Sequence, residues 1–394
     1  MTLAGTMNFR SMNKFNVVVN TLSGNFLPLT EKDTDLGLVC RTYMIFTWSV
    51  KLMYLSATTI GLLCYTSTAE AIQKGAVNTI VSLETLILTI HLRSRRENLR
   101  NLIRKINSVI VQSNDFKVYL RDAVEPPKNR LKIYSVAAAG SVVVWAGMPV
   151  LRLLETNEFT YTDFTVAAYL PGAPFNVAVF LCGILLEIMG NVYVIVKKTG
   201  IDVYVSYLIT LLTAEYRYVS GQIVDALRRE NGEKEEALVV DDLQKCVRHQ
   251  CVVMEIGENL RELLSVNVGL TYLNCILRFC FLAFALITVC KKKNPWRAYF
   301  EKFLYLMYTS GNLIQVYMLC SCVQDLLEST SITDDAFHED WYKRAVDVKR
   351  IFRVIVTSNR MECRLTAFRI VDLTIPTFAS VIGLDNFSQL KKNK

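Results

Sequence analysis

The hydrophobic residues of this chain gather into long runs, which polar and charged stretches separate. Most runs approach or exceed the roughly 20 residues that an α-helix needs to cross the hydrocarbon core of a bilayer. We therefore predict an all-α polytopic membrane protein with seven transmembrane helices. The first six are expected at residues 36–66, 72–92, 131–153, 175–198, 263–290 and 303–322, and the seventh begins near residue 365.

The terminal run differs from the others because it contains several charges. It reads LTAFRIVDLTIPTFASVIGLDNFSQL from Leu365, with Arg369, Asp372, Asp385 and, in its middle, Pro376. A charge facing lipid would cost about 2.5 kcal/mol or more on insertion scales. We therefore expect this helix to lie at the centre of an assembly, where it lines a pore. Arg369 and Asp372, three residues apart, are expected to pair on one helical face.

Basic residues set the expected orientation, since the cytosolic loops of membrane proteins are rich in Lys and Arg. The loop between the second and third spans is the most basic, and the loop after the third span has acids and almost no bases. This pattern places the N-terminus in the cytosol and, after seven crossings, the C-terminus outside. The loop at residues 291–302 is an exception, because it is basic although this topology places it outside.

Several amphipathic stretches lie beyond the predicted spans. The fourth span continues with Tyr204, Leu208 and Leu211 at helical spacing, and further helices are expected before the fifth span and near residues 341–357. These helices are predicted to form a cytosolic anchor bundle that also serves as a subunit interface. The expected layout is a cytosolic N-terminal segment (1–35), helices one to four with the pocket (36–199), anchor helices (200–262), helices five and six (263–322), another anchor helix (323–362) and the pore-lining helix seven (363–394).

Composition agrees with a membrane protein and argues against an enzyme. The 394 residues are 52% hydrophobic and 20% charged, and the mean hydropathy is +0.28. The basic residues behind the net charge of +8 cluster beside the spans, so no nucleic-acid partner is expected. With three histidines and no nucleophile-elbow, phosphate-loop or H-E-x-x-H motif, no catalytic residue is expected. Cys246, His249 and Cys251 lack a fourth zinc ligand, so no metal, cofactor or essential disulfide is expected.

The last third of the chain carries a specific pattern. It holds Ser329, Ala336-Phe337, Trp341-Tyr342, a helix over 350–360, Leu365-Thr366-Ala367, Thr377-Phe378-Ala379-Ser380 and Ser388. With the segment KCVRHQCVVMEIGENL and the loop ending YLPGAPF, the chain resembles the insect odorant receptor family. The resemblance implies an odorant-binding subunit of a tetrameric, odorant-gated, non-selective cation channel in the plasma membrane of sensory neurons. It also implies membrane lipid and a shared co-receptor as partners in a heterotetramer.

The chain resembles an odorant-specific tuning subunit more than the co-receptor, because it lacks a long insert between spans four and five. It also departs from the family at its end, which reads GLDNFSQLKKNK. Lys391 and Lys392 at the outer mouth of a cation pore would repel cations. We therefore expect this chain to be mixed with co-receptor subunits and not to form a pore alone.

The resemblance places the odorant pocket in the outer half of the membrane, among spans two, three, four and six. The matching positions are Val77, Ile80, Val81, Ala138, Ser141, Trp145, Met148, Phe180, Gly183, Ile184, Glu187, Tyr305 and Tyr308. Such a set suits a small volatile molecule, and its aromatic rings favour an aromatic or heterocyclic one. For each residue the alternative is ordinary packing between helices. For the acids Glu84 and Glu187 the alternative to a ligand contact is a structural hydrogen bond.

Polar and small residues on the last helix are the candidates for the pore lining. They are Thr377, Ser380, Val381, Leu384, Asp385, Ser388 and Gln389, with Asp385 placed to attract cations. Gating would be an outward movement of this helix when an odorant binds the open state more tightly than the closed state.

Two other classes of receptor share seven helices. A G-protein-coupled receptor would have its N-terminus outside, and the chain lacks a D-R-Y-like triplet at the end of span three. A gustatory-receptor-like channel is the second alternative, although Thr377-Phe378 and Ser388-Gln389-Leu390 only faintly match the terminal signature of those receptors. A secondary transporter is disfavoured because no repeated pair of broken helices is visible.

Overall fold

The computed structural model describes residues 8–12, 14–32, 37–64, 75–110, 114–152, 159, 164, 175–229, 233–290, 295–359 and 363–382. Nearly all of them are helical. The elements are α1 (Phe9–Met12), α2 (Lys14–Leu22), α3 (Leu38–Cys64), α5 (Val77–Ser94), α6 (Arg96–Val109), α7 (Asn114–Arg152), α8 (Val177–Leu227), α9 (Glu233–Cys290), α10 (Pro295–Ser329), α11 (Asp334–Phe337), η3 (Trp341–Lys343), α12 (Val346–Asn359), β1 (Thr366–Ala367), β2 (Val371–Asp372) and α13 (Ile375–Ile382).

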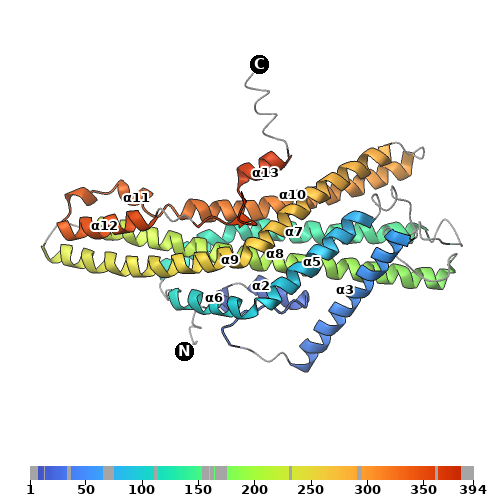
Figure 1. Ribbon diagram of the computed structural model, residues 1–394, viewed down its shortest axis with the longest axis horizontal. Helices are drawn as coiled ribbons and strands as arrows, with labels where there is room; N and C mark the ends of the chain where they lie inside the picture. The colour runs from blue at the N-terminus through green and yellow to red at the C-terminus, as the bar shows by residue number, and fades with distance from the viewer. Residues whose placement is uncertain are drawn as a thin grey trace, which may run out of the picture.

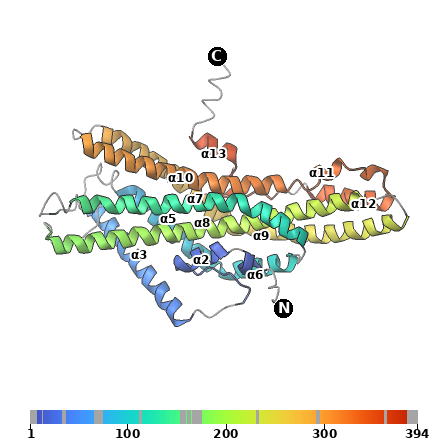
Figure 2. The same cartoon turned by 180° about the vertical axis from the view of Figure 1, so that it is seen from behind.

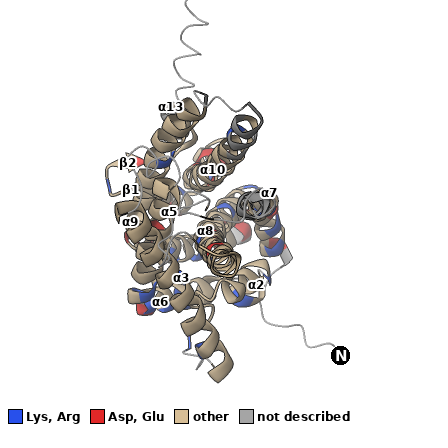
Figure 3. Cartoon of the chain, turned by 90° about the vertical axis from the view of Figure 1, so that its right-hand side faces the viewer, with Lys and Arg blue, Asp and Glu red and all other residues tan. Residues whose placement is uncertain are grey.

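The long helices α7, α8, α9 and α10 run along the length of the molecule, and α3 and α5 cross them obliquely (Figure 1). At one end α11 lies beside α8 and α12 beside α9, and α2 and α6 lie together on one side of the bundle (Figures 1 and 2). Seen along its length, the bundle surrounds α8, and most of the ribbon is neither acidic nor basic (Figure 3). Helix α8 is therefore the central element of the fold.

The sequence of α8 explains why it forms one continuous helix of 51 residues. Its N-cap is Asn176, whose side chain accepts a hydrogen bond of 2.9 Å from the backbone N–H of Val179. Beyond residue 200 almost every side chain is buried, including Tyr204, Leu208 and Leu211, so this half is covered by protein on all sides. The predicted continuation of the fourth span is thus part of the same helix.

The end of the molecule that holds α12 is a helical bundle with an aromatic cluster. The ring centroid of Trp341 lies 5.1 Å from that of Phe352, and Phe337 packs against both rings. The buried guanidinium of Arg344 donates to the carbonyl oxygen of Leu227 at 2.6 Å, at the C-terminus of α8. These contacts join the segments in which the sequence predicts anchor helices.

Six predicted spans coincide with helices α3, α5, α7, α8, α9 and α10. By length and composition alone, two helices of the described chain are long and apolar enough to cross a membrane: Val177–Leu227 and Glu235–Val289. Length and composition do not single out the other described helices, so their assignment as spans depends on the family to which the fold belongs.

The start of the predicted seventh helix is wrong. Residues 366–372 form a hairpin in which Thr366 faces Asp372 and Ala367 faces Val371, and helix α13 begins only at Ile375. Phe368 and Arg369 have backbone φ angles of +51° and +62°, which no right-handed helix accepts.

The charges of this segment consequently have different partners from those expected. Arg369 does not pair with Asp372 on a helical face. Its guanidinium lies 3.8 Å from Glu262 on α9, and Asp372 lies 3.4 Å from Arg364. Pro376 is the second residue of α13, where a missing N–H costs nothing, and is not in the middle of a helix. Both charges therefore lie in the hairpin, and the prediction that they are hidden inside a transmembrane helix is wrong.

Candidate ligand site

A charged side chain lies deep inside the helix bundle, where α8 passes α5. The side chain of Lys198 is 3% exposed, although the sequence suggests a solvated end of the fourth span at this lysine. Its ammonium nitrogen lies 2.8 Å from Asp202, one helical turn later, and 3.0 Å from Glu84 on α5. It also donates to the hydroxyl of Thr271 on α9 at 3.2 Å. Lys198 thus joins three helices.

Asp202 extends this network to two more helices. One of its carboxylate oxygens accepts hydrogen bonds from the Tyr134 hydroxyl on α7 at 3.0 Å and from the Gln315 amide on α10 at 2.7 Å. The oxygen of the same Gln315 amide accepts two bonds of 3.2 Å from the guanidinium of Arg278 on α9. Two cations and two carboxylates therefore balance inside a low-dielectric region, each with hydrogen-bond partners. We call these residues, with Glu84, Lys198 and Thr271, the polar network.

Glu84 makes structural contacts with protein groups, which the sequence offered as the alternative to a ligand contact. The side-chain amide of Asn274 donates to one of its carboxylate oxygens, and Lys198 approaches the other. Its side chain is 3% exposed. Because both oxygens are engaged with protein groups, Glu84 anchors α5 to α8 and α9.

A cavity of about 60 Å³ lies against this network, between α5, α7, α8, α9 and α10. Its walls combine aliphatic and aromatic surface with hydrogen-bonding groups. The lining residues are Val81, Tyr134, Ala137, Ala138, Ile195, Lys198, Arg278, Met307, Tyr308, Gly311, Asn312 and Gln315. An apolar cleft with a few convergent polar groups is typical of a small-molecule site.

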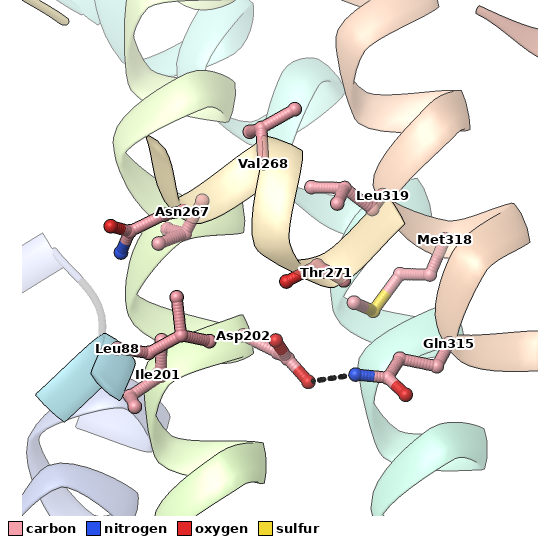
Figure 4. Close-up of a pocket in the computed structure, with 10 residues that line it drawn as sticks. Leu88, Ile201, Asp202, Asn267, Val268, Thr271, Gln315, Met318 and Leu319 are labelled. Atoms are coloured by element: carbon pink, nitrogen blue, oxygen red, sulfur yellow. Dashed lines mark hydrogen bonds between the residues drawn. The ribbon is translucent and has the colours of Figure 1, made fainter. Parts of the chain in front are cut away.

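A second, much smaller space lies on the other side of Gln315. Its volume is about 10 Å³, and its walls include Leu88, Asn267 and Met318. Figure 4 shows Asp202 and Gln315 facing each other across it, joined by their hydrogen bond. A space of this size holds about one water molecule. The larger of the two spaces lies on the side of Tyr308 and Gly311, and the polar network forms its floor.

The structure brings together three of the predicted pocket residues in this cavity: Val81, Ala138 and Tyr308. Phe180 and Ile184 instead belong to an aromatic cluster, in which the ring of Phe180 stacks on Phe159 at 4.1 Å. Val77 and Tyr305 pack in another apolar cluster with residues of α9.

Three further pocket candidates, Ile80, Gly183 and the buried Glu187, lie outside the lining of this cavity. Glu187 interacts electrostatically with Tyr54. Ser141, Trp145 and Met148 lie in helix α7, but their side chains are outside the described part of the chain.

Two of the candidate pore residues have described side chains. The hydroxyl of Thr377 donates to the carbonyl oxygen of Asp372 at 2.7 Å, which ties the first turn of α13 to the hairpin, and Ser380 is exposed. Val381 lies in α13 with its side chain outside the description. Leu384, Asp385, Ser388 and Gln389 lie outside the described residues.

The residues that give the cavity its polarity were not predicted from the sequence. These are Tyr134, Lys198, Arg278, Asn312 and Gln315. One signal was available, because Lys198 and Asp202 are four residues apart and Glu84 is an acid within another span. Arg278 gave a similar signal as a basic residue inside the fifth span.

The long helices enclose a small cavity with a charged floor and continue into a second helical bundle. A family model described as 7tm Odorant receptor matches residues 32–384. The chain belongs to the odorant receptor family.

Individual relatives agree with this assignment. Odorant receptor 13a of Drosophila melanogaster is 19% identical over 386 residues, which cover 92% of this chain and 90% of that receptor. The structure of the insect olfactory receptor OR5 from Machilis hrabei in complex with eugenol has a TM-score of 0.80 at 14% identity and covers 98% of this chain and 99% of that chain. A second structure of OR5 has a TM-score of 0.78 at 15% identity and covers 97% of each chain. The predicted fold class and family resemblance are thus confirmed.

Proposed function

We propose that this chain is the odorant-binding subunit of an odorant-gated cation channel, and that the cavity between α5 and α7–α10 receives the odorant. Its membership of the odorant receptor family supports the receptor function. The observation that supports the site is a cavity of about 60 Å³ with an apolar wall and a polar floor. The family match favours neither a G-protein-coupled nor a gustatory receptor.

The lining favours a compact, neutral volatile molecule with at least one hydrogen-bond acceptor. Val81, Ala138 and Met307 offer dispersion contacts, and the ring of Tyr308 suits an aromatic or heterocyclic ligand. The Asn312 amide can donate from the wall to a carbonyl, ether or phenol oxygen. A carboxylate ligand is disfavoured because the two cations of the floor are already balanced by Asp202 and Glu84.

Helix α10 supplies a physical route from the cavity to the terminal helix. It carries Tyr308, Gly311 and Gln315 in the cavity wall, and two residues later its Tyr317 ring packs against Phe378 of α13 with centroids 5.8 Å apart. An odorant that binds more tightly when α10 has shifted would bias the position of α13. In this proposal α13 lines the pore with Thr377, Ser380 and Val381. The residues after it, Leu384, Asp385, Ser388 and Gln389, continue the lining.

The assembly and the location are also part of the proposal. The chain would span the plasma membrane of olfactory neurons seven times, with its N-terminus in the cytosol, and join a shared co-receptor in a heterotetramer. The lysines after residue 390 support this mixed assembly, since four copies of them at one pore mouth would repel cations. The α8, α9 and α12 bundle would anchor neighbouring subunits.

The test is to express the chain with an insect co-receptor in cells and to record currents during application of a panel of small aromatic and heterocyclic volatiles. The proposal expects currents that are absent with co-receptor alone. Surface labelling of a tag on this chain controls for expression. If labelled receptor reaches the surface and no volatile evokes a current beyond that of the co-receptor alone, the proposed function is wrong.

A further inference from the structure

Two polar atoms in the wall of the proposed odorant cavity have no hydrogen-bond partner among the described residues. They are the side-chain oxygen of Asn312 on α10 and the Nε atom of Arg278 on α9. The two residues are 3% and 4% exposed. Burying a polar group without a partner is unfavourable, because the group has lost its hydrogen bonds to water and gained none. A ligand in this cavity therefore gains most from a polar group that reaches these two atoms.

The other polar atoms of both side chains are already engaged. The amide nitrogen of Asn312 donates to Sγ of Cys275, 3.9 Å away. Both terminal nitrogens of Arg278 donate to the side-chain oxygen of Gln315 at 3.2 Å, and the Tyr308 side chain interacts with the same guanidinium. These contacts hold both side chains, so the unpaired oxygen and the unpaired Nε–H are positioned before a ligand arrives.

The two unpaired atoms belong to adjacent turns of the same two helices. Asn312 and Gln315 are three residues apart on α10, and their partners Cys275 and Arg278 are three residues apart on α9. Side chains three residues apart share a helical face, with about 5–6 Å between their Cβ atoms. One ligand oxygen can bridge such a separation, because each of its two hydrogen bonds spans about 2.8 Å.

A hydroxyl group matches this arrangement, since it donates one hydrogen bond and accepts another. Its O–H would donate to the Asn312 oxygen, and its lone pair would accept from the Nε–H of Arg278. An ether or ketone oxygen can accept from Nε–H but donates nothing to Asn312, and a hydrocarbon satisfies neither atom. Aliphatic amines and carboxylic acids are charged near neutral pH, which the apolar wall and the balanced charges of the floor disfavour.

We propose that the cavity selects volatile alcohols and phenols, and that Asn312 distinguishes them from ethers and hydrocarbons of similar shape. This inference rests on the proposed odorant-binding function. The hydrocarbon part of such a molecule would lie against Val81 and Met307, which offer dispersion contacts. A site that pairs a ligand hydroxyl discriminates strongly, since a matched compound without the hydroxyl leaves the protein atoms unpaired.

The test records odorant currents from the full-length chain expressed with an insect co-receptor. The probes form two series: 4-methylphenol, 4-methylanisole and 1,4-dimethylbenzene, and then benzyl alcohol, benzyl methyl ether and ethylbenzene. Within each series a methoxy or a methyl group replaces the hydroxyl. Asn312→Leu removes the amide at nearly constant volume, and Asn312→Ala provides a second variant in case leucine prevents surface expression.

The matched control is Asn267→Leu. Asn267 is a buried asparagine of α9 that lies outside the lining of this cavity. Both of its side-chain amide atoms lack a hydrogen-bond partner among the described residues, so the control also removes an unpaired amide. Each comparison is a ratio of half-maximal concentrations for two probes on one receptor, which makes it independent of surface abundance.

In the wild type we expect each hydroxyl compound to act at a half-maximal concentration about tenfold or more below that of its hydrocarbon match, and also below that of its ether. Asn312→Leu should reduce the hydroxyl-to-hydrocarbon preference about tenfold, while Asn267→Leu should change it less than about threefold.

The inference is overturned if a hydrocarbon or ether is as potent as its hydroxyl match in the wild type, or if the two variants change the preference equally. It is also overturned, while the proposed function stands, if only volatiles without a hydroxyl evoke currents. If no volatile of any class evokes a current although the receptor reaches the surface, the proposed function itself has failed.

Discussion

The ammonium nitrogen of Lys198 on α8 lies 3.0 Å from a carboxylate oxygen of Glu84 on α5. Each side chain is 3% exposed, so both charges have lost nearly all contact with solvent. Such a pair persists only when its other atoms are also satisfied, because desolvation costs several kcal/mol per ion. Asp202, Thr271 and Asn274 supply those partners. The pair fixes the floor of the proposed odorant cavity.

Removing the ammonium group of Lys198 should therefore destabilise the protein far more than neutralising the carboxylate of Glu84. Lys198→Met leaves Glu84 and Asp202 without their ammonium partner and should cost about 3–5 kcal/mol of stability. Glu84→Gln keeps the Lys198–Asp202 pair and should cost about 1–2 kcal/mol. Lys245→Met, which changes an exposed lysine on α9, should leave the stability almost unchanged. Thermal melting and surface abundance measure this order, and equal effects of the two buried variants would contradict it.

The hairpin that precedes α13 packs against α9 at Gly269. A Cβ atom added there would lie 2.7 Å from ring atoms of Phe368, whose backbone N–H donates to the carbonyl oxygen of Ser265 at 3.3 Å. Gly269→Ala should displace the hairpin, destabilise the protein by about 1–3 kcal/mol and reduce the odorant current per surface receptor. The double variant Gly269→Ala/Phe368→Ala also removes the phenyl ring, so it should recover part of the current.

Gly140 on α7 offers the control, since an added Cβ there meets nothing within 4 Å. Gly140→Ala should leave the current unchanged. If the double variant gives no more odorant current than Gly269→Ala alone, the contact with Phe368 is not the cause of the lost current.

Glu215 and His249 form a buried contact in the proposed cytosolic bundle, with 3.0 Å between a carboxylate oxygen and a ring nitrogen. Burial raises the pKa of Glu215 above its usual value, and the hydrogen bond and charge of His249 act in the opposite direction. The pKa of Glu215 is therefore higher in the folded protein than in the unfolded chain. Over the pH range between the two values, the carboxyl of Glu215 stays protonated in the folded protein and is ionised in the unfolded chain. Stability from this group is present below the unfolded pKa and is lost as pH rises through the folded pKa.

Glu215→Gln should remove this pH dependence, since its amide is neutral at every pH. Between pH 5 and pH 8 the melting temperature of the wild type should fall more than that of the variant. Glu258→Gln, which changes an exposed acid on α9, should keep the wild-type slope. The explanation fails if Glu215→Gln and the wild type lose stability in parallel.

The long helices could be predicted because their apolar residues repeat over many turns. The run from residue 175 to 229 predicted one continuous element, and the structure has Val177–Leu227. The amphipathic stretch near 341–357 predicted a further helix, and the structure has η3 and α12 there. Periodicity identifies such elements without any knowledge of what covers them.

Features that depend on contacts between distant segments could not be found this way. The apolar character of residues 365–374 favoured a helix, but Phe368 and Arg369 adopt positive φ because the hairpin packs on α9 at Gly269. Lys198 was interpreted as the end of a span because a lysine after an apolar run marks a boundary in most membrane helices. Its partner Glu84 is more than a hundred residues away in sequence. Only the fold brings them together.

The most direct measurement for the cavity is the odorant response of Gly311→Leu, expressed with a co-receptor. Gly311 lines the cavity, and an added Cβ meets nothing within 4 Å, so leucine can fill the space without displacing a helix. Gly140→Leu makes the same change on α7 outside the lining. At equal surface abundance, we predict that Gly311→Leu raises the half-maximal odorant concentration about tenfold or more, a loss of about 1.4 kcal/mol, while Gly140→Leu changes it less than about threefold. A wild-type dose response in Gly311→Leu would contradict the assignment of this cavity as the odorant site.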